Sequence, residues 1–293
     1  MKTIIAFFYF SLLCLTSIGQ VVTSPIPEEF AKTDLQRMNL YGKAKSVRQT
    51  SFAAIKKSGV IQKGKRKIEE PNWAKDFYIV FNSTGNKTEL CTINSNGSVD
   101  NEISWQYDDS GNMVEDHRGN SDKVDTTKEN KFTYKFDDKG NIIERDRFNA
   151  KGIQDVTEIY KYDERGNVIV KSWVIGNTPC KDSLVYDEKN NMIEQYATNV
   201  VIPGKWKFTY RYDEKGNCME ENWFTDGVKF YIKYTFKYDD KGNRSEVVWT
   251  NAKGKSCKWT FQYEFDSNGN WIKSTQFLNG KPNYILEREI TYF

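Results

Sequence analysis

Residues 160–167 read Tyr-Lys-Tyr-Asp-Glu-Arg-Gly-Asn, and this stretch decides the fold because it recurs along the chain. The recurring unit is an aromatic residue, Asp or Asn, two variable residues, Gly (once Asn), and a final Asn. Its eight copies begin at Phe81, Tyr107, Phe136, Tyr162, Tyr186, Tyr212, Tyr238 and Phe265. Successive copies are 24 to 29 residues apart, and a near-constant period of this size indicates a repeat architecture.

Each copy of the unit is predicted to close a β-hairpin. Residues 229–238 alternate polar and aromatic side chains, which is the period of a half-buried strand, and residues 244–250 form the returning strand. A second turn, at residues 251–254, leads into the next hairpin. The sequence therefore predicts an all-β, antiparallel meander of consecutive hairpin repeats with about sixteen strands. Because wide sheets twist, we expect it to curl into a spiral or an open, barrel-like sheet.

The Asp and Gly residues of the repeated unit are predicted to be structural turn residues. Asp at the first position of a turn accepts hydrogen bonds from nearby backbone N–H groups, and Gly adopts the left-handed conformation that a bulged hairpin needs. The residues with this predicted role are Asp108, Asp137, Asp163, Asp187, Asp213, Asp239 and Asp266, with Gly111, Gly140, Gly166, Gly216, Gly242 and Gly269. The wide separation of these carboxylates argues against a calcium loop, so neither a metal nor a cofactor is expected.

The unit Tyr-x-Tyr-Asp-x-x-Gly-Asn, as in residues 160–167 and 210–217, resembles the tyrosine-aspartate (YD) repeats of bacterial RHS-type proteins. The resemblance covers roughly residues 73–293. It implies an all-β scaffold, often secreted or at the cell surface and sometimes linked to carbohydrate binding. The core-associated region and toxic tail of RHS toxins have no counterpart in this sequence, so the resemblance is to a small secreted YD-repeat protein.

The N-terminus has the features of a secretory signal peptide. Lys2 is followed by an apolar run, and Ser17-Ile18-Gly19 places small residues before a cleavage point. We therefore expect export to the periplasm, the cell surface or the extracellular medium. A lipid anchor at Cys14 would need a small residue before it, and Leu13 stands there, so lipoprotein anchoring is not expected.

Three parts of the chain follow from these patterns. Residues 1–19 are the expected signal peptide, residues 20–42 are an N-terminal lead-in, and residues 43–293 are the YD-type hairpin-repeat domain. Within the lead-in, residues 33–38 are expected to form one helical turn.

The charge pattern excludes several classes of partner. The chain has 43 basic and 40 acidic residues, a net charge of +3, and the two signs are interspersed, so nucleic acid is not expected to bind. The N-terminal apolar run is too short for a membrane anchor. Residues 141–148 and 285–293 are charged on both faces of their predicted strands, so a membrane-spanning barrel is not expected either.

Residues with reactive side chains are few. Four cysteines remain after the expected processing, and they are predicted to be mostly free, partly buried thiols: Cys91, Cys180, Cys218 and Cys257. The single histidine, His117, cannot form a metal cluster by itself, and no Gly-x-Ser-x-Gly or His-Glu-x-x-His motif is present. The sequence therefore predicts a protein that is not an enzyme.

The hairpin register predicts which residues share a face of the sheet. A three-residue loop with a bulged Gly places Tyr162 opposite Val168, and the same register continued without a shift places Tyr210 opposite Glu220. One face would then carry aromatic rows with a ladder of carboxylates, although a shift of one residue would move the carboxylates to the other face. The candidate ligand-binding residues are Trp173, Trp206, Trp223, Trp249 and Trp259, with Glu144, Glu194, Glu220 and Glu246.

Three functions compete on this basis. Aromatic faces beside carboxylates suit sugar rings, so the first hypothesis is an exported, non-catalytic protein that binds a polysaccharide. If the aromatics form the core and the Glu residues pair with Lys and Arg, the alternative is a scaffold that binds a cell-envelope protein. A glycoside-active enzyme is the weakest hypothesis, because equivalent Glu residues would lie about 10 Å apart, slightly wide even for an inverting pair.

Overall fold

The computed structural model describes residues 33–67, 74–94, 96–119, 129–198 and 204–293. The predicted signal peptide, Cys14 and the first part of the lead-in lie outside these residues. The predicted helical turn is present as α1 (Asp34–Arg37), which begins after Thr33, whose hydroxyl accepts a hydrogen bond from the Gln36 N–H. No helix within the described ranges is long and apolar enough to cross a membrane.

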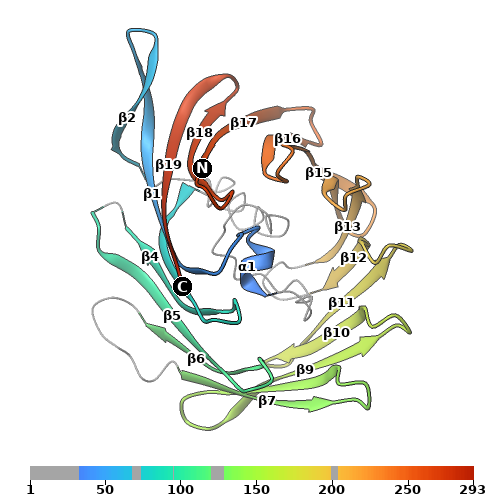
Figure 1. Cartoon of the computed structure of the whole chain (residues 1–293). Coiled ribbons are helices and arrows are strands. Elements are labelled where there is room, and N and C mark those ends of the chain that lie inside the picture. Colours follow the sequence, from blue (N-terminus) through green and yellow to red (C-terminus); the bar gives the residue numbers. More distant parts are fainter. Residues whose placement is uncertain (1–32, 68–73, 95, 120–128, 199–203) are drawn as a thin grey trace.

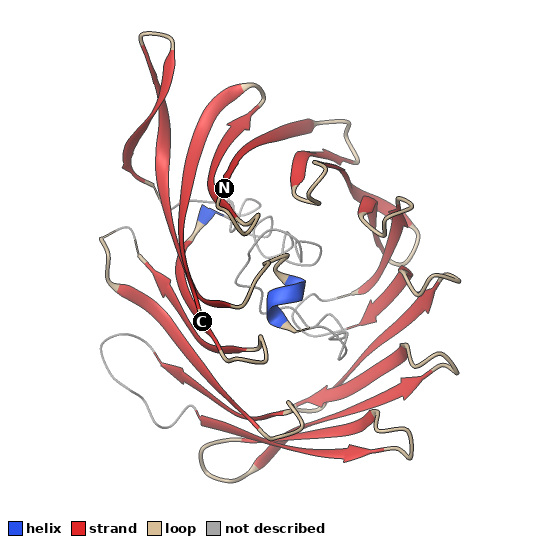
Figure 2. Cartoon of the chain, in the orientation of Figure 1, coloured by secondary structure: helices blue, strands red, loops and turns tan. Residues whose placement is uncertain are grey.

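Strands make up most of the described chain (Figure 2). They are β1 (Ala44–Lys57), β2 (Val60–Arg66), β3 (Asp76–Phe81), β4 (Lys87–Ile93), β5 (Val99–Tyr107), β6 (Met113–Gly119), β7 (Glu129–Phe136), β8 (Ile142–Phe148), β9 (Gln154–Tyr162), β10 (Val168–Ile175), β11 (Thr178–Tyr186), β12 (Met192–Thr198), β13 (Lys205–Tyr212), β14 (Cys218–Thr225), β15 (Lys229–Tyr238), β16 (Arg244–Asn251), β17 (Ser256–Phe265), β18 (Trp271–Leu278) and β19 (Lys281–Tyr292). Strands β3 to β18 are the sixteen strands of the eight repeats, and β1, β2 and β19 are additional.

The meander closes on itself, which the sequence did not predict. From β3 to β19 each strand pairs with the next, and β1 pairs with both β3 and β19, so eighteen strands form an antiparallel barrel. Strand β2 pairs with β1 in a hairpin that projects from the ring (Figure 1). Closure depends on β1, whose residue Arg48 lies opposite Glu289 on one side and Tyr78 on the other. The barrel is therefore closed by residues that contain no repeat signal.

The predicted pairs next to the turns are confirmed. The structure pairs Tyr107 with Met113, Phe136 with Ile142, Tyr162 with Val168, Tyr186 with Met192, Tyr212 with Cys218 and Phe265 with Trp271. The prediction for the next pairs is wrong, because a β-bulge follows the turn in each of these hairpins. Tyr210 lies opposite Glu221 and Arg211 opposite Glu220, with Met219 as the extra residue of the bulge. The bulge moves the Glu ladder to the face opposite the aromatic rows.

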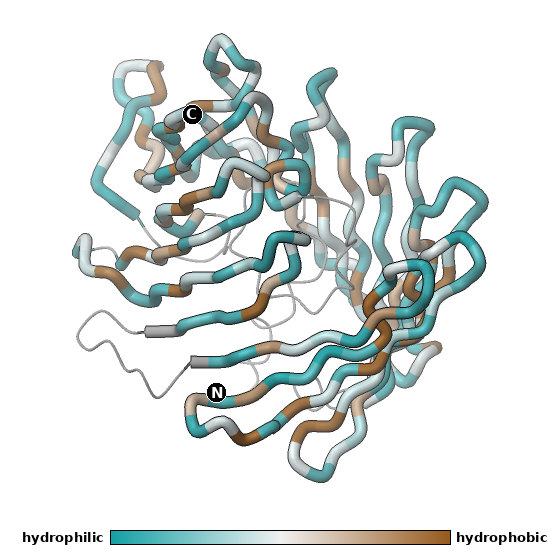
Figure 3. Tube along the Cα trace, turned by 60° about the horizontal axis from the view of Figure 1, so that its bottom comes forward, coloured by the Kyte–Doolittle hydropathy of each residue, from teal (hydrophilic) through white to brown (hydrophobic). Residues whose placement is uncertain are grey.

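The two faces of the sheet differ sharply in composition. Helix α1 lies inside the ring (Figure 1), and its Leu35 belongs to a cluster with Val47, Phe77 and Ile79, which defines the inner face. Strand pairing carries this face around the barrel, and the three other buried clusters also lie on it. Apolar and polar residues alternate along many strands (Figure 3), as expected when one face is packed and the other is wet.

Tyrosine hydroxyls join each repeat to the one before it. The hydroxyl of Tyr162 donates to the carbonyl of Ile142 at 2.7 Å, and the acceptor lies two residues after the turn Gly of the preceding repeat. Equivalent bonds join Tyr107 to Lys87, Tyr134 to Met113, Tyr186 to Val168, Tyr212 to Met192, Tyr238 to Cys218 and Tyr263 to Arg244. Where Phe136 or Phe265 occupies the turn position, the tyrosine two residues earlier donates instead. This bond gives the repeated tyrosine a structural role.

Residues 33–43 dock against turns at one end of the barrel. Every repeat turn joins an odd-numbered strand to the next even-numbered one, so all eight lie at the same end. The Leu35 N–H donates to the carbonyl of Gly85 at 3.0 Å, and the Tyr41 N–H donates to the Asn270 side chain at 2.7 Å. The Asn39 side chain donates to the carbonyl of Lys241 at 3.3 Å. The second half of the lead-in is thus part of the folded domain.

Candidate functional site

The repeated Asp side chains bind their own turns. The carboxylate of Asp187 accepts hydrogen bonds from the N–H groups of Lys189 and Asn191, each at 2.8 Å, and from the Asn191 side chain at 2.9 Å. These bonds with Asn191 lower the pKa of Asp187. Asn190, which replaces Gly in this copy, takes the left-handed φ of 63° that the turn requires. The carboxylate is thereby occupied within the turn.

The four predicted Glu residues lie on the outer face and pair with basic residues. Glu220 contacts Lys233 at 2.7 Å and Arg211 at 3.3 Å, and the hydrogen bond from Lys233 is the main cause that lowers its pKa to about 2. The other ion pairs are Glu144 with Lys135, Glu194 with Lys207, and Glu246 with Lys237 and Lys258. These carboxylates are paired with basic residues and point away from the tryptophans.

The five predicted tryptophans lie on the inner face. Trp206, Trp223 and Trp259 are 9%, 1% and 6% exposed, whereas Trp173 and Trp249 are half-buried. The indole N–H of Trp223 donates to the carboxylate of Glu221 at 2.5 Å. The glutamate in contact with Trp223 is therefore Glu221 and not the predicted Glu220. The structure does not bring the predicted Trp and Glu residues together.

A different set of charged residues meets on the inner face of β8 to β11. This inner charged cluster consists of Arg145, Glu158, Lys171 and Asp182. Arg145 contacts one carboxylate oxygen of Glu158 at 2.5 Å, and Lys171 contacts the other at 2.9 Å. Asp182 lies directly across from Lys171 in the strand pairing. Lys171 is 5% exposed and Asp182 is 2% exposed, so the cluster is largely dry.

The two carboxylates of the inner charged cluster titrate differently. Burial raises the pKa of Glu158, but Arg145 and Lys171 outweigh burial, and the pKa falls below its usual value. Burial dominates at Asp182 and raises its pKa from 3.8 to about 7, although Lys171 and Gln195 oppose the shift. One oxygen of Asp182, Oδ1, has no hydrogen-bond partner among the described residues. Divergent pKa values and an unsatisfied buried oxygen are features of a functional site as well as of structural ion networks.

Aromatic side chains flank the inner charged cluster. The hydroxyl of Tyr160 donates to Glu158 at 2.6 Å, and Trp173 lies opposite Glu158 in the strand pairing. The ammonium of Lys171 is 5.6 Å from the ring centre of Tyr160 and 5.3 Å from that of Trp173. Of the predicted tryptophans, Trp173 alone is assigned to this cluster.

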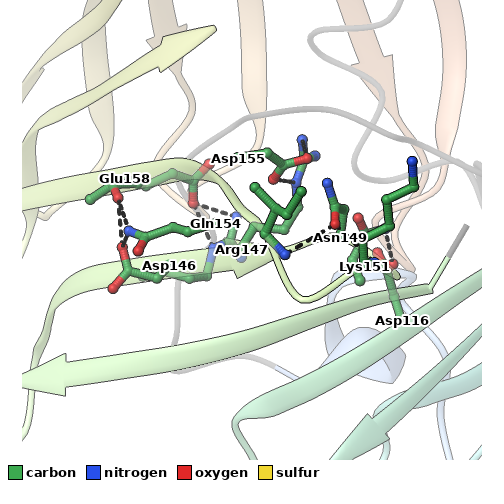
Figure 4. A network of polar contacts seen from close by, with 12 residues as sticks. Asp116, Asp146, Arg147, Asn149, Lys151, Gln154, Asp155 and Glu158 are labelled. Carbon is green, nitrogen blue, oxygen red and sulfur yellow. Dashed lines mark hydrogen bonds and ion pairs between the residues drawn. The ribbon is translucent and has the colours of Figure 1, made fainter. Parts of the chain in front are cut away.

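The neighbouring β8–β9 hairpin adds polar contacts (Figure 4). Arg147 pairs with Asp155 through two hydrogen bonds of 2.8 and 3.1 Å, and Asp146 accepts from Gln154 at 2.8 Å. The Asn149 side chain accepts from the Lys151 N–H at 2.9 Å within the turn. These residues satisfy one another and are at least partly exposed. They hold the hairpin that carries Glu158.

Sequence patterns did not reveal the inner charged cluster, although a positional signal exists. The fifth residue after the turn Gly, or after Asn190 in the copy that lacks it, always lies in the same inward row. These eight residues are Leu90, Asp116, Arg145, Lys171, Gln195, Glu221, Val247 and Ser274. A polar residue in an inward row is easy to mistake for an outward one when the bulge is not included. Its position becomes recognisable only with the shifted register.

The four cysteines within the described ranges are free, as predicted. Cys91, on the outer face, lies within 4.8 Å of side-chain oxygens of Glu89 and Glu102. Burial and these two carboxylates raise the pKa of the Cys91 thiol to about 12, so it remains protonated at neutral pH.

Comparisons with known proteins give no family for this chain. No protein-family model matches the sequence, and no curated protein matches it. A porin-like protein from Bacteroides uniformis is 9% identical with a TM-score of 0.41, and the match covers 85% of this chain and 98% of that chain. The Photorhabdus luminescens Tc holotoxin pore is 11% identical with a TM-score of 0.34, covering 77% of this chain but only 13% of that chain.

Proposed function

We propose that this protein is an exported, non-catalytic scaffold of the YD-repeat kind. Its outer face contacts water, and it binds cell-envelope proteins. The observation that supports the proposal is the reversal of the two faces relative to a membrane pore. The outer face carries ion pairs, and the inner face carries the packed aromatics.

The outer face carries polar and charged residues that suit contact with water. Lys258, Thr260 and Gln262 are successive outward residues of β17, and Glu246 on β16 pairs with Lys258. A lysine facing lipid near the bilayer midplane costs about 2–4 kcal/mol, and such residues recur on neighbouring strands of this barrel. An outer surface of alternating Lys and Glu suits contact with a charged protein surface.

The proposal of a non-catalytic role rests on the state of the outer carboxylates. Hydrogen bonds from basic neighbours lower the pKa of Glu194, Glu220 and Glu246. Glycoside hydrolysis needs an acid whose pKa is raised so that it holds a proton at working pH, and the pKa values of these three glutamates are shifted in the opposite direction.

Phase partitioning with a pore assay tests this proposal. The mature chain, purified without detergent, should partition into the aqueous phase of a Triton X-114 separation and should produce no conductance steps in a planar bilayer. Cross-linking through outer lysines such as Lys237 and Lys258 should then identify bound envelope proteins. Recovery only in the detergent phase, or ion conductance, would contradict the proposal.

A second candidate function is glycan binding at the inner charged cluster. Asp182 Oδ1 is a buried acceptor without a donor, and a sugar hydroxyl is a donor of the right kind. Trp173 and Tyr160 supply aromatic surface beside it. This candidate retains the predicted glycan but replaces the predicted glutamates with Glu158 and Asp182.

Fluorescence titration separates the two candidates. The mature protein would be titrated with soluble polysaccharides while tryptophan emission is followed. Glycan binding at the cluster predicts a saturable change that is lost in Trp173→Ala and kept in Trp249→Ala, which is half-buried on the inner face at the same repeat position. An unchanged emission with every polysaccharide would leave the protein scaffold as the proposal.

A further inference from the structure

A second charged group on the inner face, Arg288 of β19, lacks the partner that its burial demands. Its side chain is 4% exposed, and its guanidinium lies 3.5 Å from the ring centre of Trp271. Among the described residues, only Gln49 accepts a hydrogen bond from Arg288, through its side chain and the Nε–H at 3.1 Å. The terminal nitrogens Nη1 and Nη2 have no hydrogen-bond partner in the part of the chain that the structure describes.

Within the described parts of the chain, no carboxylate forms an ion pair with Arg288. Buried charges in proteins are normally paired, because removing an ion from water is expensive. Burial lowers the pKa of Arg288 to about 9, which leaves the guanidinium charged at neutral pH. The site therefore holds a positive charge whose compensation must come from elsewhere.

A second guanidinium strengthens the positive field. Arg244 is 2% exposed, and its guanidinium lies 4.3 Å from the ring centre of Phe236. Burial and the Asp239 carboxylate raise the pKa of the Tyr263 hydroxyl, whereas Arg288 and Arg244 both oppose that shift, so both cations act on one hydroxyl.

We propose that Arg288 anchors an internal binding site for a carboxylate, which accepts hydrogen bonds from Nη1 and Nη2. The two terminal nitrogens of a guanidinium form a planar pair of donors that matches the two oxygens of a carboxylate. Trp271 holds the plane of the guanidinium, and Gln49 fixes its rotation. The carboxylate comes from an acidic sugar or from a small organic acid. This site is separate from the inner charged cluster and does not rest on the scaffold function.

Thermal unfolding with matched additives tests the site. The Tm of the mature wild-type protein would be measured in a low-salt chloride buffer with sodium glucuronate, sodium acetate, glucose or sodium chloride added. The three salts would be compared at equal ionic strength. Glucuronate and acetate should raise Tm saturably, by on the order of 5 °C at a hundredfold excess over Kd. Glucose and chloride should not. A lower Kd for glucuronate than for acetate would identify an acidic sugar, and equal values a simple carboxylate.

Substitutions connect the response to one side chain. Arg288→Met should abolish the carboxylate response and, without additive, should unfold at a higher temperature than wild type, because the unpaired buried charge is gone. Arg211→Met removes an exposed outer guanidinium and should keep the response. If Arg288→Met does not fold, Arg288→Lys, which keeps the charge but loses the paired donors, should raise Kd at least tenfold. A wild type without response, or an undiminished response in either Arg288 variant, would overturn the site.

Discussion

Glu220 and Glu221 are neighbours on β14, and they occupy opposite environments. Glu220 points outward, where Lys233 and Arg211 pair with it in contact with water. Glu221 points inward, is 1% exposed and accepts the indole N–H of Trp223. The same residue type on the same strand is thus a screened surface charge on one face and part of a dry, packed network on the other.

The two faces of the barrel differ in how much a side chain contributes to the free energy of unfolding. On the outer face, exposed ion pairs contribute roughly 0–1 kcal/mol each, so the face tolerates exchange. On the inner face, burial of large aromatics and unpaired charges involves several kcal/mol per residue. Substitutions that are equivalent in chemistry should therefore differ by face.

The largest difference is expected for aromatic residues. Trp223→Ala should lower the free energy of unfolding by about 3–5 kcal/mol, because it leaves a cavity and removes the donor to Glu221. Phe224→Ala, one residue away on the outer face, should cost about half as much or less. Urea unfolding of both variants measures the difference. Equal losses would mean that the two faces are not packed differently.

The next largest effect is expected at Asp182 and depends on pH. The pKa of Asp182 in the folded state, about 7, lies above its ordinary value of 3.8. Its contribution to the free energy of unfolding is therefore fully present below about pH 4 and is lost as the pH rises through 7. Asp182→Asn should therefore match wild type near pH 4 and be more stable above pH 7, by at most about 4 kcal/mol. Unfolding at five pH values between 4 and 8 measures this divergence.

A turn residue provides a control of opposite sign. The pKa of Asp187 is lowered by its bonds with Asn191, so its contribution is present above the unfolded pKa and is lost as the pH falls. Asp187→Asn should be less stable than wild type at pH 7 and approach it in acid. If both variants shifted in the same direction with pH, the assignment of Asp182 to a dry inner site would be wrong.

A smaller effect is expected from the tyrosine hydroxyls that join the repeats. Tyr186→Phe should lose about 0.5–1.5 kcal/mol, because the carbonyl of Val168 loses its donor and Leu184, two residues earlier, cannot replace it. In Tyr212→Phe, Tyr210 stands in the position from which Tyr134 and Tyr263 donate in their repeats. Tyr212→Phe should therefore be the milder of the two in thermal unfolding, and a reversed order would contradict such compensation.

The parts of the fold that the sequence predicted are those set by local geometry. The turn places Tyr162 opposite Val168 whatever the rest of the chain does, so the hairpins and their first pairs followed from a short motif. Barrel closure depends on pairing between β1 and β19, which are separated by nearly the whole domain. No local pattern in residues 44–57 specifies that contact, and the predicted open sheet was less exact for this reason.

The candidate site could not be predicted because one residue per hairpin decides it. Met219 is an ordinary strand residue in sequence, but as the extra residue of a bulge it exchanges the faces of Glu220 and Glu221. The period-two pattern is preserved on either side of the bulge, so alternation alone does not reveal the shift. The inner charged cluster and Arg288 are visible only after the register and the closure are both known.

The smallest effect is expected for Glu220 itself. Its pKa of about 2 means that the ion pair contributes above the unfolded pKa, near 4.3, and is lost as the pH falls toward 2. Because Lys233 and Arg211 are well exposed, Glu220→Gln should cost less than about 1 kcal/mol at pH 7, and 0.5 M salt should reduce the loss further. Chemical unfolding of the variant and wild type at low and high salt measures this. A loss above 2 kcal/mol that salt does not change would place Glu220 in a dry environment and remove the contrast with Glu221.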